Sequence, residues 1–295
     1  MLHESDARAR RAALNVSGVA LLLAIAKTIV GLSAGSIAVL SSALDSAGDM
    51  LASFANFVFL TIAAKPPDEG HHFGHGKAEH LATMLQGVVL MAGAIEIGIK
   101  AIERIRMPHA IESGEVAIVT MIGSTIVTIF IARYLRRNAT QADSTALAGD
   151  AMHYTSDYLA NGATIAALII VRITGNPLWD SILGLSVAGW IAWSSLYLLW
   201  NAGAALMDPA LPEEEIARIV EAIEKCDPEV VGYRDLRTRR AGGMRFIEFD
   251  LCIDRSVSFE VAHDVSERVK QRIFEMFKRV VVTVHAEPVS KQPAS

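Results

Sequence analysis

The first 205 residues of the chain contain a series of long apolar stretches, which constrain the fold more than any other feature. An α-helix needs about 20 mainly apolar residues to cross a bilayer. Six stretches reach that length, at residues 12–34, 37–63, 79–104, 114–135, 145–172 and 178–205. Hydrophobic residues make up 52% of the chain, more than in an ordinary soluble protein. The sequence therefore predicts an α-helical membrane protein with six transmembrane helices.

The positive charges between these stretches predict the orientation of the chain. Lys and Arg are enriched on the cytoplasmic side of membrane proteins. Here they gather in the N-terminal arm, in the 64–78 loop and after the fourth stretch: Arg8, Arg10, Arg11, Lys65, Lys77, Arg133, Arg136 and Arg137. The first stretch is longer than the apolar core of a signal peptide, and no clear cleavage site follows it. We therefore expect a multi-pass protein of the inner (plasma) membrane, with both termini in the cytoplasm.

A change of pattern near residue 208 predicts a second domain. Helical periodicity at 211–226 and 258–277 alternates with strand-like segments at 229–239, 245–254 and 279–287. This αββαβ order is typical of a small α+β domain with its helices on one side of a three-stranded sheet. We expect a transmembrane domain at 1–208 and an α+β domain at 209–295, which ends in a short loose tail. A core of this size would gain stability from a partner.

Composition and motifs exclude several functional classes. The formal net charge of −5 gives no basic surface for nucleic acid. The chain has two cysteines, Cys226 and Cys252, and no CxxC, which argues against a disulfide framework or a thiolate zinc cluster. No HExxH motif is present, so the best argument for a metalloprotease is missing. The sequence predicts a protein that is not an enzyme.

Two carboxylates, Asp45 and Asp49, lie one helical turn apart inside the second apolar stretch. A charged side chain near the bilayer centre costs on the order of 3 kcal/mol on insertion scales, so this pair needs compensation. His153 and Asp157 in the fifth stretch have the same spacing. Two helices with two such side chains each would close a cage of three carboxylates and an imidazole, which suits a divalent metal such as zinc.

Other roles for these intramembrane residues stay open. The carboxylates would also be stable beside a water-filled vestibule or in a proton relay without any metal. Lys27 in the first stretch is expected to snorkel or to pair with a carboxylate. The small residues Ser46, Ala47 and Gly48 are expected to let the fifth helix approach closely.

The 64–78 loop and its flank are rich in histidine. His71, His72, His75 and His80 lie close to Asp68 in the segment DEGHHFGHGKAEH. Short histidine-rich tracts suggest metal binding. The alternative is a solvated loop that binds metal only adventitiously.

Several of these segments together resemble the cation diffusion facilitator family. GLSAGSIAVLSSALDSAGD (31–49) is similar to the family's motif over its first two spans, DEGHHFGHGKAEHLA (68–82) to its loop motif and HYTSD (153–157) to its fifth-span motif. The resemblance covers residues 10–288. It implies a homodimer that exports divalent metal from the cytoplasm in exchange for protons, by alternating access, with a metallochaperone-like cytoplasmic domain.

The resemblance also implies the site residues. The transport site would be Asp45, Asp49, His153 and Asp157, and the histidine is more similar to members that carry zinc, cadmium or ferrous iron. A second metal site in the loop would use Asp68, His71 and His75. Lys77 and Asp208 would form a charge interlock between the loop and the exit of the last span.

In the cytoplasmic domain the resemblance is partial. His263, His285 and Glu287 match one half of the two-metal site that the family often has at its dimer interface. Arg234 and Asp250 stand where the other half has histidines, with Asp250 expected at a sheet edge, opposite the apolar positions. A cation beside the site opposes a second divalent ion. We therefore expect one metal per protomer or none, with Arg234 pairing with Asp250 or Glu287; a purely salt-bridged interface is the alternative.

The sequence as a whole predicts proton-coupled export of a divalent cation: zinc first, with ferrous iron or cadmium as alternatives. Metal binding needs a neutral imidazole, and histidine titrates near pH 6.5 when unperturbed, so His153 is the expected proton carrier. A membrane-anchored metal sensor or assembly protein is the alternative. The physiological metal, the proton stoichiometry and the role of the cytoplasmic site stay open.

Overall fold

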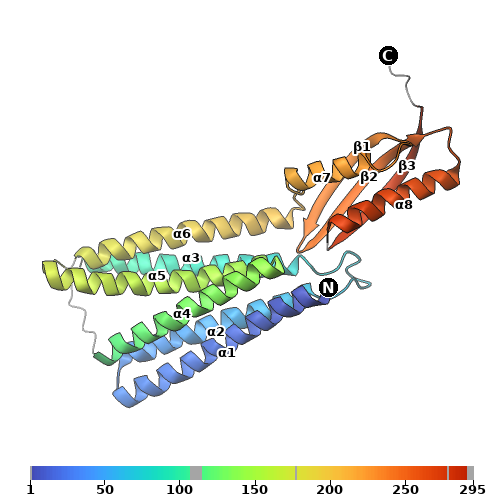
Figure 1. The fold of residues 1–295 in the computed structure, drawn as a ribbon. Coiled ribbons are helices and arrows are strands. Elements are labelled where there is room, and N and C mark those ends of the chain that lie inside the picture. Colours follow the sequence, from blue (N-terminus) through green and yellow to red (C-terminus); the bar gives the residue numbers. More distant parts are fainter. Residues whose placement is uncertain (1, 107–114, 177, 278, 291–295) are drawn as a thin grey trace. The chain divides into compact units, whose positions relative to one another are not determined.

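The computed structural model describes residues 2–106, 115–176, 178–277 and 279–290. Its elements are drawn in Figure 1. Apart from the first two residues, the chain divides into two compact units at residues 203 and 204. We call them the membrane unit and the C-terminal unit and describe each by itself. The start of the predicted fourth span, residue 114, and most of the predicted loose tail, 291–295, lie outside the described residues.

Six long helices account for most of the membrane unit as described. They are α1 (Leu2–Ala34), α2 (Ile37–Ala63), α3 (Ala78–Arg106), α4 (Glu115–Ala142), α5 (Thr145–Thr174) and α6 (Leu178–Leu206). Within the described residues, all of these except α5 are long and apolar enough to cross a membrane. α5 has 30 residues, but polar side chains interrupt its first half. The predicted spans are thus all helices, and the fifth is the least apolar.

Two helices are longer than their apolar stretches. α1 begins at Leu2 rather than near residue 12, because its charged N-terminal arm also carries buried alanines. Ala9 and Ala12 pack in the same core as Leu135 of α4. α4 continues past the predicted end at 135 to Ala142. Helices therefore extend beyond the apolar stretches wherever one face of the polar extension is packed.

Packing within the membrane unit centres on α5, which lies against α3 and α4 and also contacts α2. One apolar core joins side chains from α1 through α5, and a second joins α3 to α6 through Leu90 and Leu198. α3 and α6 come very close at Gly87, where an added Cβ would lie 2.8 Å from a side-chain carbon of Leu199. The backbone oxygen of Gly87 accepts a hydrogen bond from Ser195 Oγ at 2.6 Å.

The C-terminal unit has the predicted αββαβ order. Its elements are α7 (Glu213–Glu224), β1 (Val230–Ala241), β2 (Met244–Asp254), α8 (Phe259–Met276) and β3 (Val280–Val289). The sheet order is β1-β2-β3, with β1 antiparallel and β3 parallel to β2. α8 is the crossover that joins the parallel strands, as such a connection requires.

One face of this sheet forms the core with both helices. The alternating residues of β2 are at most 2% exposed and pack with buried side chains of α7 and α8: Ile247, Phe249, Leu251 and Ile253. This confirms the alternation predicted from the sequence. Asp250 alternates with Phe249 and Leu251 and so lies on the opposite face of the sheet, as expected. Because β2 is the middle strand, Asp250 does not lie at a sheet edge, which corrects that part of the expectation.

Candidate metal centre

Three of the four predicted transport-site ligands meet in the membrane unit. Asp49 comes from α2, and His153 and Asp157 come from α5, one turn apart. His153 Nε2 lies 3.0 Å from Asp49 Oδ1 and 3.8 Å from Asp157 Oδ2. One ligand atom from each residue lies within 4.8 Å of the other two. We call these residues the membrane cluster; residues 104 positions apart in the sequence thus share one site.

The membrane cluster has the donors that a divalent cation requires. The side chains of His153, Asp49 and Asp157 are 9%, 25% and 33% exposed, so the cluster is only partly open to solvent. Asp157 Oδ2 and His153 Nδ1 are buried and have no hydrogen-bond partner. Two carboxylates and an imidazole are suitable ligands for zinc and related divalent metals. The residues therefore fit a divalent cation as a transported substrate.

Asp45 lies outside the membrane cluster. It lines a cavity of about 270 Å³ together with Asp49 and Asp157, but it is exposed and is not among the three converging ligands. Glu96 and Lys100 of α3 line the same cavity and form an ion pair at 2.5 Å. The sequence analysis did not identify this pair, although its i, i+4 spacing inside an apolar stretch is the same signal that marked Asp45 and Asp49.

The expectation for Gly48 is wrong, and of the two alternatives for Lys27 only snorkelling is excluded, since Lys27 lines the same cavity as Asp45, Asp49 and Asp157. Lys27 does not snorkel: it is 8% exposed, and its Nζ donates to Ser46 Oγ at 2.8 Å and to the backbone oxygen of Ser42 at 3.4 Å. Gly48 does not provide a close approach for α5, because an added Cβ would have open space around it. Ser46 instead accepts the hydrogen bond from Lys27 of α1, so this small residue of α2 contributes to the contact between α1 and α2.

The loop brings its predicted ligands together as well. Asp68 Oδ1 lies 3.3 Å from His71 Nδ1, and Asp68 Oδ2 lies 3.3 Å from His75 Nε2. The His71 and His75 rings stack obliquely, with centroids 4.4 Å apart. We call these residues the loop cluster; their ligand atoms also lie within 4.8 Å of one another.

The backbone of the loop prepares Asp68 as a ligand. Its Oδ1 accepts hydrogen bonds from the N–H groups of Gly70 at 3.0 Å and His71 at 2.8 Å. Partial desolvation raises the pKa of Asp68, but the hydrogen bonds from His71 and Gly70 outweigh it and hold the pKa below its usual value. The carboxylate is therefore ionised at neutral pH.

The other two histidines of this segment lie elsewhere. His72 is exposed and is not among the converging ligands. His80 belongs to α3, is 5% exposed, and places Nδ1 3.4 Å from Thr145 Oγ1. The histidine-rich pattern thus combines a loop cluster with a histidine buried between helices α3 and α5.

In the C-terminal unit Asp250, His285 and Glu287 share one face of the sheet, whereas His263 lies on α8, which packs on the other face. Asp250 is paired in register with Arg234 on one side and with His285 on the other. Arg234 Nη1 lies 3.6 Å from Glu287 Oε2, which is one of the two contacts expected for this arginine. Among the described residues, the metal-type clusters are the membrane and loop clusters, and His263, His285, Glu287 and Asp250 form no third one.

Cys252 is a neighbour that the sequence analysis did not connect to this surface. It is paired in register with Glu287, two positions after Asp250. Burial raises the pKa of its thiol, which Arg234 partly opposes. Its place in the alternation of β2, on the same side as Asp250, was the signal that would have identified it.

Lys77 and Asp208 lie in different units, so their predicted interlock stays a prediction. Within the C-terminal unit Asp208 Oδ1 accepts a hydrogen bond from Arg239 Nη1 at 3.2 Å. Arg239 also stacks on Phe246, with its guanidinium carbon 4.2 Å from the ring centroid.

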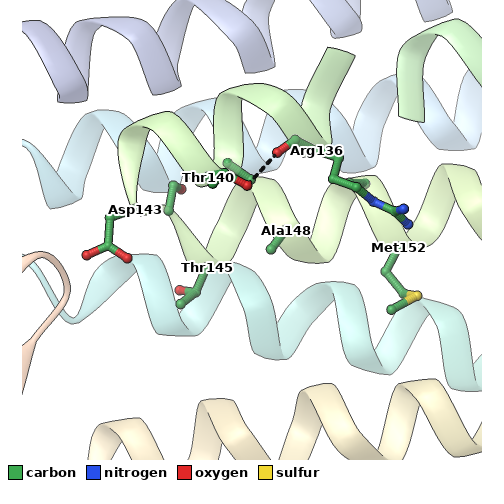
Figure 2. A pocket seen from close by; sticks show the side chains of 9 residues that line it. Arg136, Thr140, Asp143, Thr145, Ala148 and Met152 are labelled. Atoms are coloured by element: carbon green, nitrogen blue, oxygen red, sulfur yellow. Dashed lines mark hydrogen bonds between the residues drawn. The ribbon is translucent and has the colours of Figure 1, made fainter. Parts of the chain in front are cut away.

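A second cavity, of about 390 Å³, lies beside the junction of α4 and α5. Figure 2 shows Arg136 and Thr140 of α4 near Thr145, Ala148 and Met152 of α5. Thr140 Oγ1 donates to the backbone oxygen of Arg136 at 3.1 Å. No predicted site residue lines this cavity, so it lies apart from the metal centre.

Comparisons with known proteins identify the family of this chain. The sequence profile of the cation efflux transmembrane domain matches residues 14–207, and the profile of the cation efflux protein cytoplasmic domain matches residues 211–289. The cation-efflux pump FieF of Cronobacter sakazakii is 33% identical over 99% of this chain and 97% of its own length. FieF of Shewanella oneidensis is 33% identical over 94% of this chain and 93% of its own length.

Among solved structures, the nickel form of a MamM C-terminal-domain variant has 30% identity and a TM-score of 0.25. It covers 27% of this chain and 100% of its own. The two family profiles together span nearly the whole chain and confirm the family resemblance. The chain therefore belongs to the cation efflux family, the cation diffusion facilitators that its motifs resemble, and is a multi-pass secondary transporter rather than an enzyme.

Proposed function

We propose that this protein exports a divalent cation from the cytoplasm through the membrane cluster, in exchange for protons and by alternating access. The observation that carries the proposal is the convergence of Asp49, His153 and Asp157 from two helices beside a cavity in the membrane unit. Intramembrane ionisable residues that face one another mark ion pathways. The FieF relatives, which are named cation-efflux pumps, support the outward direction.

Proton exchange follows from the chemistry of the ligands. A divalent metal binds neutral imidazole and ionised carboxylates, so protons compete with it for the same atoms. An imidazole nitrogen must give up its proton before it can bind a metal, which makes His153 the first proton carrier. A site that opens to one side at a time would release metal where protons replace it.

Zinc is the cation that we favour, with ferrous iron and cadmium as alternatives. The membrane cluster offers one nitrogen and carboxylate oxygens in a partly enclosed setting. Such a donor set suits zinc but also binds neighbouring divalent metals. Selection among them depends on geometry and on supply in the cell, which is why a panel of metals is needed.

The same proposal covers assembly and placement. We infer a homodimer in the inner (plasma) membrane, with both termini cytoplasmic and with the domains at 1–208 and 209–295. The small core of the C-terminal unit supports a role in dimerisation. The loop cluster would capture metal before transport. The surface around His263, His285, Glu287 and Asp250 would hold one metal per protomer or none, because Arg234 already pairs with Glu287.

A membrane-anchored sensor or assembly protein remains the second candidate function. The loop cluster, which is exposed, is the observation that favours it, because it would bind metal without any transport. The membrane cluster argues against it, since an anchor has no use for buried carboxylates that attract a cation.

Reconstitution of the protein into liposomes tests both candidate functions. A dye trapped inside reports each metal of a panel of zinc, ferrous iron, cadmium and manganese, with and without an imposed pH gradient. We expect zinc movement that depends on the gradient and stops when a protonophore collapses it. Zinc binding without any zinc movement would favour the sensor, and movement that ignores the gradient would contradict proton exchange.

A further inference from the structure

A second group of polar side chains is buried in the membrane unit, next to the membrane cluster. It joins α2, α3 and α5, and each member is at most 2% exposed: Ser53, Asn56, Gln86, Asp150 and Tyr154. Asp150 precedes His153 by one turn of α5 and is completely buried. We call this group the Asp150 network. It contains a carboxyl group that the proposed function does not use.

The hydrogen bonds of the Asp150 network leave a surplus of acceptors. Asp150 Oδ1 accepts from Ser53 Oγ at 3.1 Å and from Gln86 Nε2 at 3.1 Å. Asp150 Oδ2, Gln86 Oε1 and Asn56 Oδ1 are buried and have no partner. When the Asp150 carboxyl is ionised, all three of these oxygens can accept hydrogen bonds but cannot donate them. What the network lacks is a donor, and a proton on Asp150 Oδ2 supplies one without requiring any extra volume.

A chain of hydroxyl groups connects Asp150 to the metal cavity. Ser53 Oγ, which bonds to Asp150, also lies 3.1 Å from Tyr154 Oη. Tyr154 lines the cavity of about 270 Å³ together with Asp49 and Asp157. A hydroxyl group both donates and accepts, so it can receive a proton on one side and pass one on at the other. Ser53 and Tyr154 thus form a two-step path between the buried carboxyl and the cavity.

We propose that Asp150 is a second proton-binding site of the exchange, which holds a proton when the membrane cluster is empty and releases it through Ser53 and Tyr154 when a divalent cation binds. This inference rests on the proposed function and adds a named proton carrier to it. The step is balanced: the O–H bond of the Asp150 carboxyl breaks, the electron pair stays on the carboxylate, and the proton leaves to water in the cavity.

The charges around Asp150 explain why the cation would expel the proton. A divalent cation one turn away on the same helix favours the ionised carboxylate, and the effect is strong in a buried setting. The charged and titratable groups near this part of α5 include Asp49 of α2, Glu79 and His80 of α3, Arg136 of α4, and His153, Tyr154 and Asp157 of α5 itself. Arg136 lines the second cavity together with Ala148 and Met152 (Figure 2). A divalent cation that displaces the proton proposed on His153 adds two positive charges and removes one, so Asp150 would experience a net gain of positive charge.

Infrared difference spectroscopy of the full-length protein tests the protonation directly. A protonated carboxyl has a carbonyl stretch distinct from that of a carboxylate. We expect added zinc to remove one such band in the wild type and in the control Asp143→Asn, an exposed carboxylate near the start of α5. The amide of Asp150→Asn has the same shape as the carboxyl and supplies the missing donor. In this variant zinc should not remove such a band. A wild type without the zinc-induced loss, or an unchanged loss in D150N, would overturn the proposal.

Transport measurements then test the role in exchange. With a zinc dye and a pH dye in the same proteoliposomes, D150N should move one proton fewer per zinc than the wild type and D143N. Tyr154→Phe keeps the ring but breaks the hydroxyl path, so it should slow the zinc-induced loss of the band. An unchanged proton-to-zinc ratio in D150N would overturn the role of Asp150 even if the wild type couples zinc to protons. A wild type that moves zinc without protons would instead contradict the proposed function.

Discussion

The membrane cluster and the loop cluster use the same kinds of ligand in opposite settings. In the loop, Asp68, His71 and His75 lie within eight consecutive residues, and the side chains of Asp68 and His71 are more than half exposed. In the membrane unit, Asp49 and His153 are 104 residues apart and are brought together by helix packing. The first arrangement is local and solvated, and the second is long-range and partly buried.

This difference separates two tasks. The loop cluster depends on one short turn, so it persists whatever the helices do. The membrane cluster exists only while α2 and α5 keep their present contact, so any relative movement of these helices changes its affinity. Alternating access requires a site of the second kind, because metal must be bound in one state and released in another. Substitutions at both clusters test this distinction.

Removing a ligand of the membrane cluster should have the largest effect. We expect Asp157→Ala or Asp49→Ala to lower the zinc transport rate by at least about 100-fold. Mutation of a residue that only hydrogen-bonds to a metal ligand already lowers metal affinity or activity by about 10- to 100-fold. Uptake into proteoliposomes measures it, with Glu221→Ala, an exposed carboxylate on α7, as the control. A wild-type rate in either variant would show that zinc does not pass through this cluster.

Asp45→Ala should have a smaller effect, on the order of 10-fold, because Asp45 lines the cavity without joining the three converging ligands. It would attract the cation rather than hold it. The same transport assay distinguishes the two roles. A loss as large as that of D49A would mean that the working site is the four-ligand cage predicted from the sequence.

The double variant His71→Ala and His75→Ala should lose one bound zinc per chain while its transport rate falls by less than about 10-fold. His72→Ala is the matched control, since His72 lies outside the loop cluster. Elemental analysis of the full-length protein counts the metal. Transport abolished to the same degree as in D157A would remove the distinction between capture in the loop and passage through the membrane.

The loop cluster should also have a defined pH dependence. The pKa of Asp68 is held below its usual value, so this carboxylate stays ionised as the pH falls from 7 to 5. The loss of zinc affinity caused by Asp68→Asn should therefore be the same at pH 7 and at pH 5, as zinc titrations of the full-length protein measure. If Asp68→Asn left the affinity at pH 7 unchanged, the carboxylate would not be a ligand.

Arg234→Ala should have the smallest effect on transport but should raise the zinc content of the C-terminal unit. The guanidinium faces Glu287 and lies at the register position beside Asp250, where it opposes a divalent ion. Arg237→Ala, an exposed arginine of the same strand, is the control. An unchanged metal content in R234A would favour a purely salt-bridged interface.

Features that repeat along one helix or strand were predictable from the sequence. The i, i+4 pairs in α2 and α5 and the alternation around Phe249 both follow from the geometry of a single element. Side-chain positions set by distant neighbours were not predictable. Lys27 bonds to Ser46, Asp45 stays on the cavity wall, and Asp150 reaches Gln86 because of how α1, α3 and α5 pack around α2. A rotation of one helix by a few tens of degrees would change each of these contacts and leave the sequence pattern as it is.

X-ray absorption at the zinc edge tests the central assignment most directly. The protein used is the full-length variant His71→Ala, His75→Ala, His263→Ala and His285→Ala, which lacks the predicted imidazole ligands outside the membrane cluster. The account predicts one bound zinc with a single imidazole nitrogen at about 2.0–2.1 Å and carboxylate oxygens at about 2.0–2.2 Å. This zinc should disappear when His153→Ala is added. Absence of bound zinc in this four-histidine variant, or a bound zinc that persists unchanged without His153, would contradict the account.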